Sequence, residues 1–377
     1  MASLITNLAT DQIAALSTST LSRLTSEDWA AFSTDQFQAL TTSQFASLGT
    51  RAFSQISTAQ FAVIETQDLR VLNTAVVRSL STAQLGALGT AQVGSLSTNQ
   101  VATLTTSQVN NLSTDNLNSL GTDQFRALNS ANIGAISTAQ ASALESADVA
   151  ALATNQVAQL SSSQLGALAT ANIEALGSQQ VAALNSRQVA GLGTDQVAAL
   201  ETQDLRALNT AALRALSTAQ IDALGSAQIQ GLSTAQVASL TTVQVNNLSS
   251  DDLNALGSDQ IRALNSAQLA ALSTAQVSTM ESADLVALST AQVGNLGSAQ
   301  LGAISTANIQ AMDTQQFAAL SSRQVAGLGT DQVAALETQD LRALNTAALR
   351  ALSTAQTDAR GSAQIEGLST AQVASLT

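Results

Sequence analysis

The sequence predicts an all-α solenoid of very short helices, each built from one eight-residue repeat. Three observations support this fold class. An apolar residue recurs at every eighth position, a Ser or Thr follows it two residues later, and the charged residues fall at spacings that share one face of a short helix. The same repeat runs through nearly the whole chain, so a conventional enzyme domain is not expected.

The repeat is defined by counting from Leu8 in steps of eight. Of the 47 positions reached up to Leu376, 46 hold Leu, Ile, Met or Phe, and the exception is Arg360. We call this residue position 1 of an octad. Position 3 is Ser or Thr in every complete octad, position 5 is nearly always Gln, Asp or Asn, and position 6 is a larger apolar residue except at Ala141 and Thr357.

A longer sequence repeat is superimposed on the octad. The segment Glu-Thr-Gln-Asp-Leu-Arg at 65–70 recurs at 201–206 and at 337–342, an offset of 136 residues or 17 octads (17 × 8 = 136). Whole blocks of octads have therefore been duplicated without a change of phase. We expect one continuous array over residues 1–377, with no domain boundary inside it.

Aromatic residues mark the first part of the array. Position 6 is aromatic in five successive octads within residues 1–64, at Trp29, Phe37, Phe45, Phe53 and Phe61. Terminal repeats often carry special residues that seal the core, which predicts an N-terminal capping region. A ligand-binding aromatic cluster is the alternative interpretation.

The octad fits a short helix better than a long helix or a strand. In a continuous helix the apolar stripe would drift by about 80° per octad. A strand would turn position 4 inward, although that position carries Asp11, Arg51 and Asp123. In a short helix, positions 4 and 7 share an outer face, as Asp123 and Arg126 do. Position 6 and the next position 1 then point to the core.

Two registers for the start of the helix remain open. If position 2 is the N-cap, Gln at position 5 completes a capping box and apolar positions 1 and 6 form a hydrophobic staple. If the Ser or Thr at position 3 is the N-cap, Gly or Asn at position 2 would end the preceding helix. We favour the first register, and in both we expect position 3 to flank the core.

Such short helices must stack to be stable, because a helix of one and a half turns does not persist alone. Small residues at position 8 and one large residue at each corner suit a narrow core, which favours about three octads per coil. At a helix spacing of about 8–10 Å, roughly fifteen coils would extend on the order of 120–150 Å.

The composition leaves little chemistry for a catalytic site. The chain has no His, Cys or Tyr, so a serine triad and a thiolate metal site are both excluded. Calcium binding by the densest carboxylates, Asp251-Asp252 and the Glu-Thr-Gln-Asp segments, is less favoured than a solvated helix face. Arg206, Arg214, Arg342 and Arg350 are candidates for a small anion-binding stripe, which is also disfavoured. We predict no enzyme activity and no catalytic, cofactor-binding or metal-binding residues.

Charge and hydropathy limit the partners. A thinly spread net charge of −13 argues against nucleic-acid binding, which requires a clustered basic surface. No apolar stretch approaches the length needed to insert into a membrane, and MASLITNLATDQ lacks the features of a signal peptide. The chain stops at Leu376-Thr377 with its composition unchanged, which predicts an apolar end face that self-associates or meets a further module.

The octads of the form L-[ST]-T-A-Q-V-A-A resemble tandem segments of long bacterial surface and secreted proteins, including adhesin-like ones. The pattern is also similar to triangular short-helix α-solenoids called Toblerone folds. The resemblance covers essentially the whole chain and implies an extracellular or cell-surface location, with the cytoplasm as alternative. Some such proteins carry haem-utilisation labels, but Met280 and Met312 occupy position 1, where core packing is the expected role.

Two functions follow from these observations. The first is a structural spacer or stalk region of a larger protein. The second is a binding solenoid that recognises a protein, a glycan or another regular surface through its outer face. A periodic Thr face would suit ice or a polysaccharide only if position 3 faced water. A contiguous outer patch of one character would favour the binding solenoid, whereas scattered outer residues favour the spacer.

Overall fold

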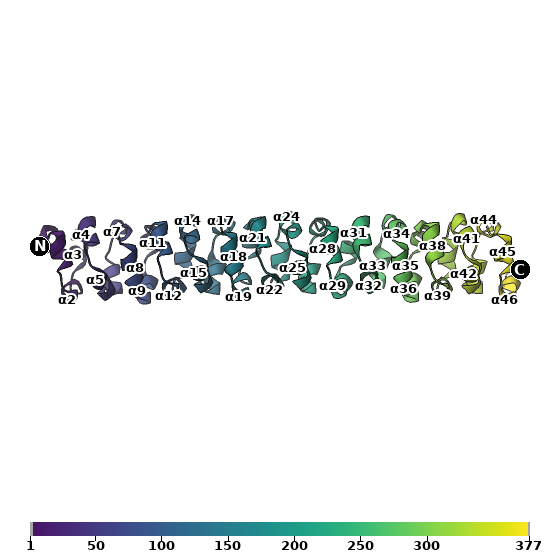
Figure 1. Cartoon of the computed structure of the whole chain (residues 1–377), viewed down its shortest axis with the longest axis horizontal. Helices are drawn as coiled ribbons and strands as arrows, with labels where there is room; N and C mark the ends of the chain where they lie inside the picture. Colours follow the sequence, from purple (N-terminus) through teal and green to yellow (C-terminus); the bar gives the residue numbers. More distant parts are fainter. Residues whose placement is uncertain (1–2, 376–377) are drawn as a thin grey trace. The chain divides into compact units, whose positions relative to one another are not determined.

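The computed structural model describes residues 3–375, in two compact units, Met1–Leu184 and Asn185–Thr377. The described residues form 46 α-helices and one 3-10 helix, with no strand among them. Figure 1 shows the short helices following one another within each unit. The all-α fold class is confirmed. The octad phase passes unbroken from Leu184 to Leu192, and the continuity of the array across the two units stays a prediction.

The helices of the first unit each occupy one octad, and they are η1 (Leu4–Asn7), α1 (Thr10–Ala14), α2 (Thr18–Leu21), α3 (Ser26–Ala31), α4 (Thr34–Gln38), α5 (Thr42–Ser47), α6 (Thr50–Phe53), α7 (Thr58–Ala62), α8 (Thr66–Val71), α9 (Thr74–Ser79), α10 (Thr82–Gly86), α11 (Thr90–Gly94), α12 (Thr98–Ala102), α13 (Thr106–Asn110), α14 (Thr114–Asn118), α15 (Thr122–Ala127), α16 (Ser130–Ala135), α17 (Thr138–Ser142), α18 (Ser146–Ala151), α19 (Thr154–Val157), α20 (Ser162–Ala167), α21 (Thr170–Glu174) and α22 (Ser178–Ala182).

The helices of the second unit follow the same pattern, and they are α23 (Ser186–Ala190), α24 (Thr194–Ala198), α25 (Thr202–Ala207), α26 (Thr210–Arg214), α27 (Thr218–Asp222), α28 (Ser226–Gln230), α29 (Thr234–Ser239), α30 (Thr242–Asn246), α31 (Ser250–Ala255), α32 (Ser258–Ala263), α33 (Ser266–Ala271), α34 (Thr274–Thr279), α35 (Ser282–Ala287), α36 (Thr290–Gly294), α37 (Ser298–Ala303), α38 (Thr306–Ala311), α39 (Thr314–Ala318), α40 (Ser322–Ala326), α41 (Thr330–Ala335), α42 (Thr338–Ala343), α43 (Thr346–Arg350), α44 (Thr354–Asp358), α45 (Ser362–Glu366) and α46 (Thr370–Ser375).

Every α-helix begins at position 3, so position 2 is the N-cap and the favoured register is confirmed. At the start of α7, the Ser57 hydroxyl accepts a hydrogen bond from the backbone N–H of Gln60, and the Ser57 N–H donates to the Gln60 Oε1 at 2.9 Å. No described residue has a positive φ, so Gly or Asn at position 2 does not end the preceding helix in a left-handed conformation.

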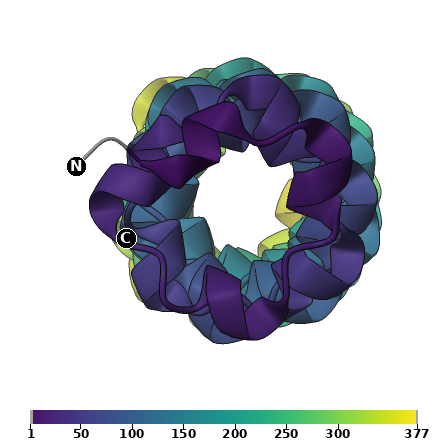
Figure 2. The same ribbon diagram turned by 90° about the vertical axis from the view of Figure 1, so that its left-hand side faces the viewer.

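The helices stack with a period of three octads. Helix α12 packs on α15, α29 packs on α32, and within each unit helix n contacts helix n+3 in the same way. In the end view of Figure 2, the purple helices of the first unit form the sides of a closed ring. One coil therefore contains three octads, as predicted.

The core is made by positions 1 and 6. Position 6 is covered by the following coil, because Val333 and Leu341 are completely buried, whereas Ile365 and Val373 in the last described coil are 50% and 49% exposed. Positions 4 and 7 face solvent along both units, as predicted. The predicted end face at Leu376-Thr377 lies outside the described residues.

The expectation that position 3 flanks the core was wrong. Thr66, Thr82, Thr210 and Thr234 are exposed, and other residues at this position are exposed or half-buried. Position 3 is the first helical residue after a corner of the coil, and the following coil covers its side chain only in part, as at Thr42 and Ser258. Where this residue is exposed, as at Thr66 and Thr210, the side of the coil presents a hydroxyl to solvent.

Candidate functional site

Stacked coils are joined by a ladder of side-chain amides from position 5. The Oε1 of Gln60 accepts the N–H of its own N-cap residue, while its Nε2 donates to the carbonyl oxygens of Trp29 at 2.9 Å and Phe32 at 3.0 Å in the preceding coil. A primary amide suits this place because it supplies an acceptor and two donors. The Gln residues of this ladder are largely buried, and their chemistry is used within the fold.

Asn at position 5 makes a shorter version of the same contact. In α21, the Nδ2 of Asn172 donates to the carbonyl oxygen of Leu144 at 2.9 Å, 28 residues earlier. In α16, Asn132 reaches the carbonyl oxygen of Leu104 at 3.0 Å. The shorter side chain reaches one carbonyl group instead of two and does not complete a capping box.

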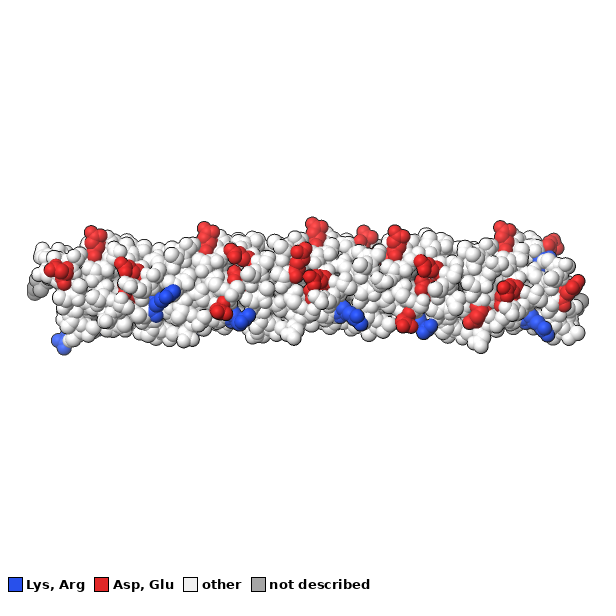
Figure 3. All heavy atoms as spheres, in the orientation of Figure 1, with Lys and Arg blue, Asp and Glu red and all other residues white. Residues whose placement is uncertain are grey.

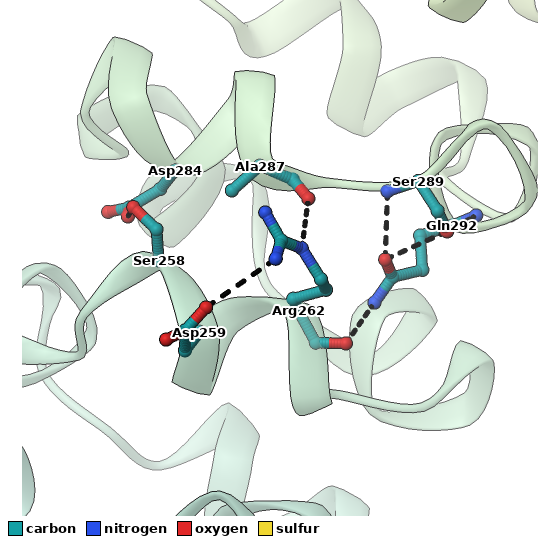
Figure 4. A network of polar contacts seen from close by, with 7 residues as sticks. All are labelled: Ser258, Asp259, Arg262, Asp284, Ala287, Ser289 and Gln292. Atoms are coloured by element: carbon teal, nitrogen blue, oxygen red, sulfur yellow. Dashed lines mark hydrogen bonds and ion pairs between the residues drawn. The ribbon is translucent and has the colours of Figure 1, made fainter.

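A second set of donors runs in the opposite direction, from position 7 to the following coil. The Nε of Arg262 donates to the carbonyl oxygen of Ala287 at 3.2 Å, at the C-terminal end of α35 (Figure 4). Arg262 also forms an ion pair with Asp259 at 3.5 Å, and the backbone carbonyl of Arg262 accepts from Gln292 at 2.9 Å. Exposed ion pairs contribute little stability, so the backbone contacts account for most of the effect of Arg262.

Five octads replace the position 5 amide by Asp and place Glu at the N-cap. They are the pairs Glu65 and Asp68, Glu145 and Asp148, Glu201 and Asp204, Glu281 and Asp284, and Glu337 and Asp340. All five aspartates are buried. An ionised carboxylate cannot donate to carbonyl groups of the preceding coil as Gln and Asn do. These octads, together with those of Asp28 and Asp252, place a titratable group at the ladder position.

Burial raises the pKa of two of these carboxyl groups, those of Asp148 and Asp340. Loss of solvation raises the pKa of Asp148 to about 6, and the negative charge of Glu145 adds to the effect. Burial, and then Glu337, likewise raises the pKa of Asp340 to about 6.

Two further aspartates have an additional hydrogen-bond donor. Burial also raises the pKa of Asp68 and Asp284, but a hydroxyl group opposes the shift in each case. The Thr42 hydroxyl donates to Asp68 at 2.7 Å, and the Ser258 hydroxyl donates to Asp284 at 3.3 Å (Figure 4). A donor to the ionised form favours that form, so each hydroxyl group opposes the effect of burial on the pKa.

The carboxylates considered for calcium do not gather into a site. Asp251 is exposed, whereas its neighbour Asp252 is buried and accepts from the hydroxyls of Ser249 at 2.6 Å and Ser226 at 2.9 Å. Within residues 3–375, no three Asp, Glu, His or Cys side chains lie close enough together to hold a metal ion. Asp252 thus serves as a hydrogen-bond acceptor between coils.

The arginines considered for an anion-binding stripe are spread over different sides of the coil. Arg206 lies on α25 and Arg214 on the next helix, α26. Arg342 and Arg350 are divided in the same way between α42 and α43. Consecutive helices form different sides, so each pair is separated by a corner. Met280 and Met312 are 3% and 4% exposed and pack in the core, as expected of position 1.

The N-terminal aromatic residues are core residues. The Trp29 and Phe32 rings stack with centroids 5.3 Å apart, and Phe37 meets Phe45 edge to face at 5.5 Å. Trp29 is 1% exposed, so this packing fits the core interpretation better than an open aromatic cluster. The first coil has Ile13 and Leu21 at position 6, and the aromatic residues therefore begin one coil inside the array.

The outer surface carries isolated charges. On the face shown in Figure 3, acidic and basic side chains are separated by uncharged residues and form no large patch of either sign. None of the helices within residues 3–375 has the length and hydropathy that a membrane crossing requires.

Sequence reasoning found the role of the position 5 Oε1 but missed the role of its Nε2. The capping box is a local pattern, whereas the second contact joins residues 28 and 31 apart, as in Gln60. The regular occurrence of Gln or Asn at position 5 indicated this second contact, because N-terminal capping alone does not require an amide in so many octads.

The comparisons with known proteins agree with this architecture. No curated protein matches the chain. The family model of the ALTTAQ repeat matches twelve segments, at residues 5–42, 61–98, 85–114, 117–154, 141–178, 168–202, 197–234, 223–250, 247–281, 277–314, 303–338 and 333–359. These segments cover most of the sequence and share its octad pattern. The chain therefore belongs to the ALTTAQ repeat family.

Proposed function

We propose that the chain is a non-catalytic structural region that acts as a spacer or stalk within a larger bacterial surface or secreted protein. The observation that supports this most is the use of the chemically capable side chains inside the fold. The position 5 amides join one coil to the preceding one, as Gln60 does, and position 7 donors such as Arg262 join it to the following one.

The outward positions support the same function. Positions 4 and 7 hold mainly small or uncharged residues, with single charges between them. A surface that recognised one partner would concentrate aromatic or like-charged side chains in a contiguous patch. A spacer needs only a soluble outer face, and its useful property is the distance gained with each added coil.

The test separates dependence on length from dependence on outer residues. The chain is displayed on a cell surface with a peptide tag at its far end, below a polymer layer of defined height, and antibody access to the tag is measured. Removal of whole 24-residue coils should reduce access in steps. Replacement of the exposed Asp, Glu and Arg residues by Ser should leave access unchanged. Antibody access to the tag that does not change with the number of coils would contradict the spacer function.

A binding solenoid is the second candidate, and the exposure of position 3 favours it. Thr210 and Thr234 lie in neighbouring coils and present hydroxyl groups to solvent. Periodic hydroxyls of this kind suit a glycan. Binding on a glycan array, lost when exposed Thr residues at position 3 of one side are replaced by Ala, would support this function over the spacer.

A further inference from the structure

Two surface asparagines lie outside the amide ladder and belong to the same three-residue motif. In Asn111-Leu112-Ser113 and in Asn247-Leu248-Ser249, an Asn is followed two residues later by a Ser hydroxyl. No other Asn of the chain is followed by Ser or Thr at this spacing. The motif Asn-x-Ser, in which x is any residue except Pro, is the acceptor sequence for N-linked sugars.

The structure places both motifs at a corner of the coil. Asn111 ends α13 with φ −92° and ψ −1°, and Ser113 is the N-cap of the next helix. The Asn and Ser residues are exposed, whereas the middle residue, Leu112, is buried in the core. The second motif is arranged in the same way, with φ −88° and ψ −7° at Asn247. A sugar on either Asn would therefore extend into solvent without displacing a core residue.

The amide groups of these two asparagines remain free for modification, because the ladder does not use them. The Nδ2 of Asn111 donates to the carbonyl oxygen of Ser107 at 2.8 Å, in the helix that Asn111 ends. The Nδ2 of Asn247 donates to the carbonyl oxygen of Thr218 at 3.2 Å, in the preceding coil. Each Nδ2 carries two hydrogens, so a bond to a sugar replaces one and leaves the other for this contact.

The surface beside Asn247 has room for the first sugar. A hollow on the outer side of the coil is lined by Thr242, Val243, Asn246, Asn247 and Ala271. Val243 is 63% exposed, the largest value among the exposed large apolar residues of the described chain. Residues four apart share one face of a helix, so Val243 lies beside the Asn247 amide. The apolar face of a sugar ring attached there would cover Val243 and remove it from water.

We propose that Asn111 and Asn247 are acceptors for N-linked glycosylation. The Nδ2 of each Asn bonds to the anomeric carbon of a sugar, and the bond between that carbon and a diphosphate breaks. The diphosphate, which is carried on a nucleoside or on a polyprenyl lipid, leaves with the electron pair of the broken bond. Nδ2 loses one proton to a base of the transferase.

The folded coil sets the order of events. Leu112 is buried, so the transferase reaches the three residues of the motif before this corner of the coil closes. The finished sugar then lies on the outer surface. Such sugars are compatible with a spacer and with a binding solenoid, so this proposal and the proposed function can fail separately.

The chain contains a matched control for these sites. Asn295 also ends its helix, with φ −94° and ψ −9°, and it is exposed next to a buried leucine. The residue two positions later is Gly297, which has no hydroxyl group. Asn295 thus shares the octad position and the backbone conformation of the two acceptors but lacks the Ser of the motif. We expect no sugar on Asn295.

The test examines the full chain purified from the cells that produce it. Cleavage after arginine gives peptides 79–126, 215–262 and 263–323, which contain Asn111, Asn247 and Asn295 in turn. Mass spectrometry should show at least one hexose or N-acetylhexosamine on the Asn of the motif in the first two peptides and none on Asn295. A single sugar indicates a nucleotide-linked donor, whereas an oligosaccharide indicates a lipid-linked donor.

Variants of the hydroxyl residue test the motif. Ser113→Ala should abolish the modification of Asn111, whereas Ser113→Thr keeps the hydroxyl group and the N-cap and should retain the modification. Gly297→Ser supplies the missing hydroxyl group and should add a sugar to Asn295. Asn110→Gln changes the neighbouring exposed amide and should leave Asn111 modified. Because the transfer precedes closure of the corner, weaker folding of a variant does not account for a lost sugar.

Three results would overturn the proposal. An unmodified Asn111 or Asn247 in the protein from its producing cells would exclude that residue as an acceptor. A sugar on Asn111 that survives Ser113→Ala, or a sugar on Asn295 in the unaltered chain, would show that the motif is not what the transferase recognises. Sugars found only on Ser and Thr residues would assign the modification to hydroxyl groups instead.

Discussion

The Nε2 of Gln316 lies 2.8 Å from the carbonyl oxygen of Leu288, 28 residues earlier, and its Oε1 accepts the N–H of Asp313 at 3.0 Å. One side chain thus caps the N-terminus of its own helix and joins that helix to the preceding coil. The Gln316 side chain is 1% exposed, so water cannot replace either contact. Repetition of this contact sets the register between coils.

Loss of one ladder amide should weaken the array locally. Gln316→Ala leaves two buried carbonyl groups and one N–H without their partner, which costs about 1–3 kcal/mol. Amide exchange should show faster opening of α39 and of the coil that precedes it. The neighbouring Gln315 is exposed, and Gln315→Ala should change protection by less than about 0.5 kcal/mol. Equal effects of the two substitutions would contradict the ladder.

The buried aspartates should make the protein more stable in mild acid. The pKa of Asp148 and of Asp340 rises from 3.8 to about 6 on folding, so the folded state binds more protons than the unfolded state between these values. The free energy of unfolding therefore rises as the pH falls from 7 towards 5, and this added stability is lost as the pH rises through 6. Melting temperatures measured across this range give the sign.

Substitution by Asn tests the origin of that pH dependence. Asn occupies position 5 elsewhere, as Asn172 does, so Asp148→Asn with Asp340→Asn should raise the melting temperature at pH 7 and flatten its dependence between pH 5 and 7. Asp195 lies at the exposed position 4, and Asp195→Asn is the control that should keep the original slope. An unchanged slope in the double variant would exclude these two carboxyl groups as its cause.

Two glycines at position 7 of adjacent helices should respond oppositely to Ala. A Cβ at Gly94 would lie 2.7 Å from the carbonyl oxygen of Ser119, so Gly94→Ala forces two coils apart and costs about 1–3 kcal/mol. A Cβ at Gly86 would meet nothing within 4 Å, and Gly86→Ala should stabilise α10 by about 0.5–1 kcal/mol. Chemical denaturation of the two variants checks the signs, and destabilisation by both would contradict this account.

The octads around Arg360 should open before the rest of the second unit. Arg360 is 8% exposed at a core position, its Nε donates to the carbonyl oxygen of Thr357 at 3.3 Å, and its Nη1 has no partner among the described residues. Burial accordingly lowers the pKa of the Arg360 guanidinium. Arg360→Leu together with Thr357→Ile restores the apolar pair found at Leu224 and Ile221.

The measurement compares amide exchange of residues 353–375 in the original and the repaired protein. The repaired protein should exchange more slowly there by a factor that corresponds to about 2–4 kcal/mol, because it gains apolar burial and loses an unpaired buried donor. Residues 217–239 have the same octad pattern without the defect and should be unaffected. Equal protection before and after repair would show that Arg360 is accommodated without cost.

The octad was sufficient to predict the helices, the coil of three and the outward face of positions 4 and 7. It was insufficient where a side chain has a partner in another coil. Gln60 illustrates the difference, because its capping role spans three residues and its second contact spans 28 and 31. The interruption of the amide ladder at Ala52 was missed for the same reason, although Ala at position 5 departs from the consensus of the octad.

The error at position 3 has a geometric cause. Its regular occupancy by Ser or Thr suggested a place beside the core, but residues such as Thr234 lie at a corner and face solvent. Small hydroxyl residues suit the first turn of a helix that follows an extended corner. The constraint on position 3 is thus local, and regular occupancy alone does not show burial.

Because each coil takes three octads, a duplicated block of 17 octads is two octads longer than five whole coils. Within the second unit, α25 stacks through α28, α31, α34, α37 and α40 onto α43, whereas its duplicate in sequence, α42, belongs to the stack of α36 and α39. The motif at 201–206 and its copy at 337–342 therefore point in different directions. Duplication of 17 octads therefore places the new copy on a different side of the coil from the original. Copies of one motif are in this way distributed around the axis of the unit. The number of octads that are copied thus determines which side of the coil carries the new motif, and no residue of the repeat has to change.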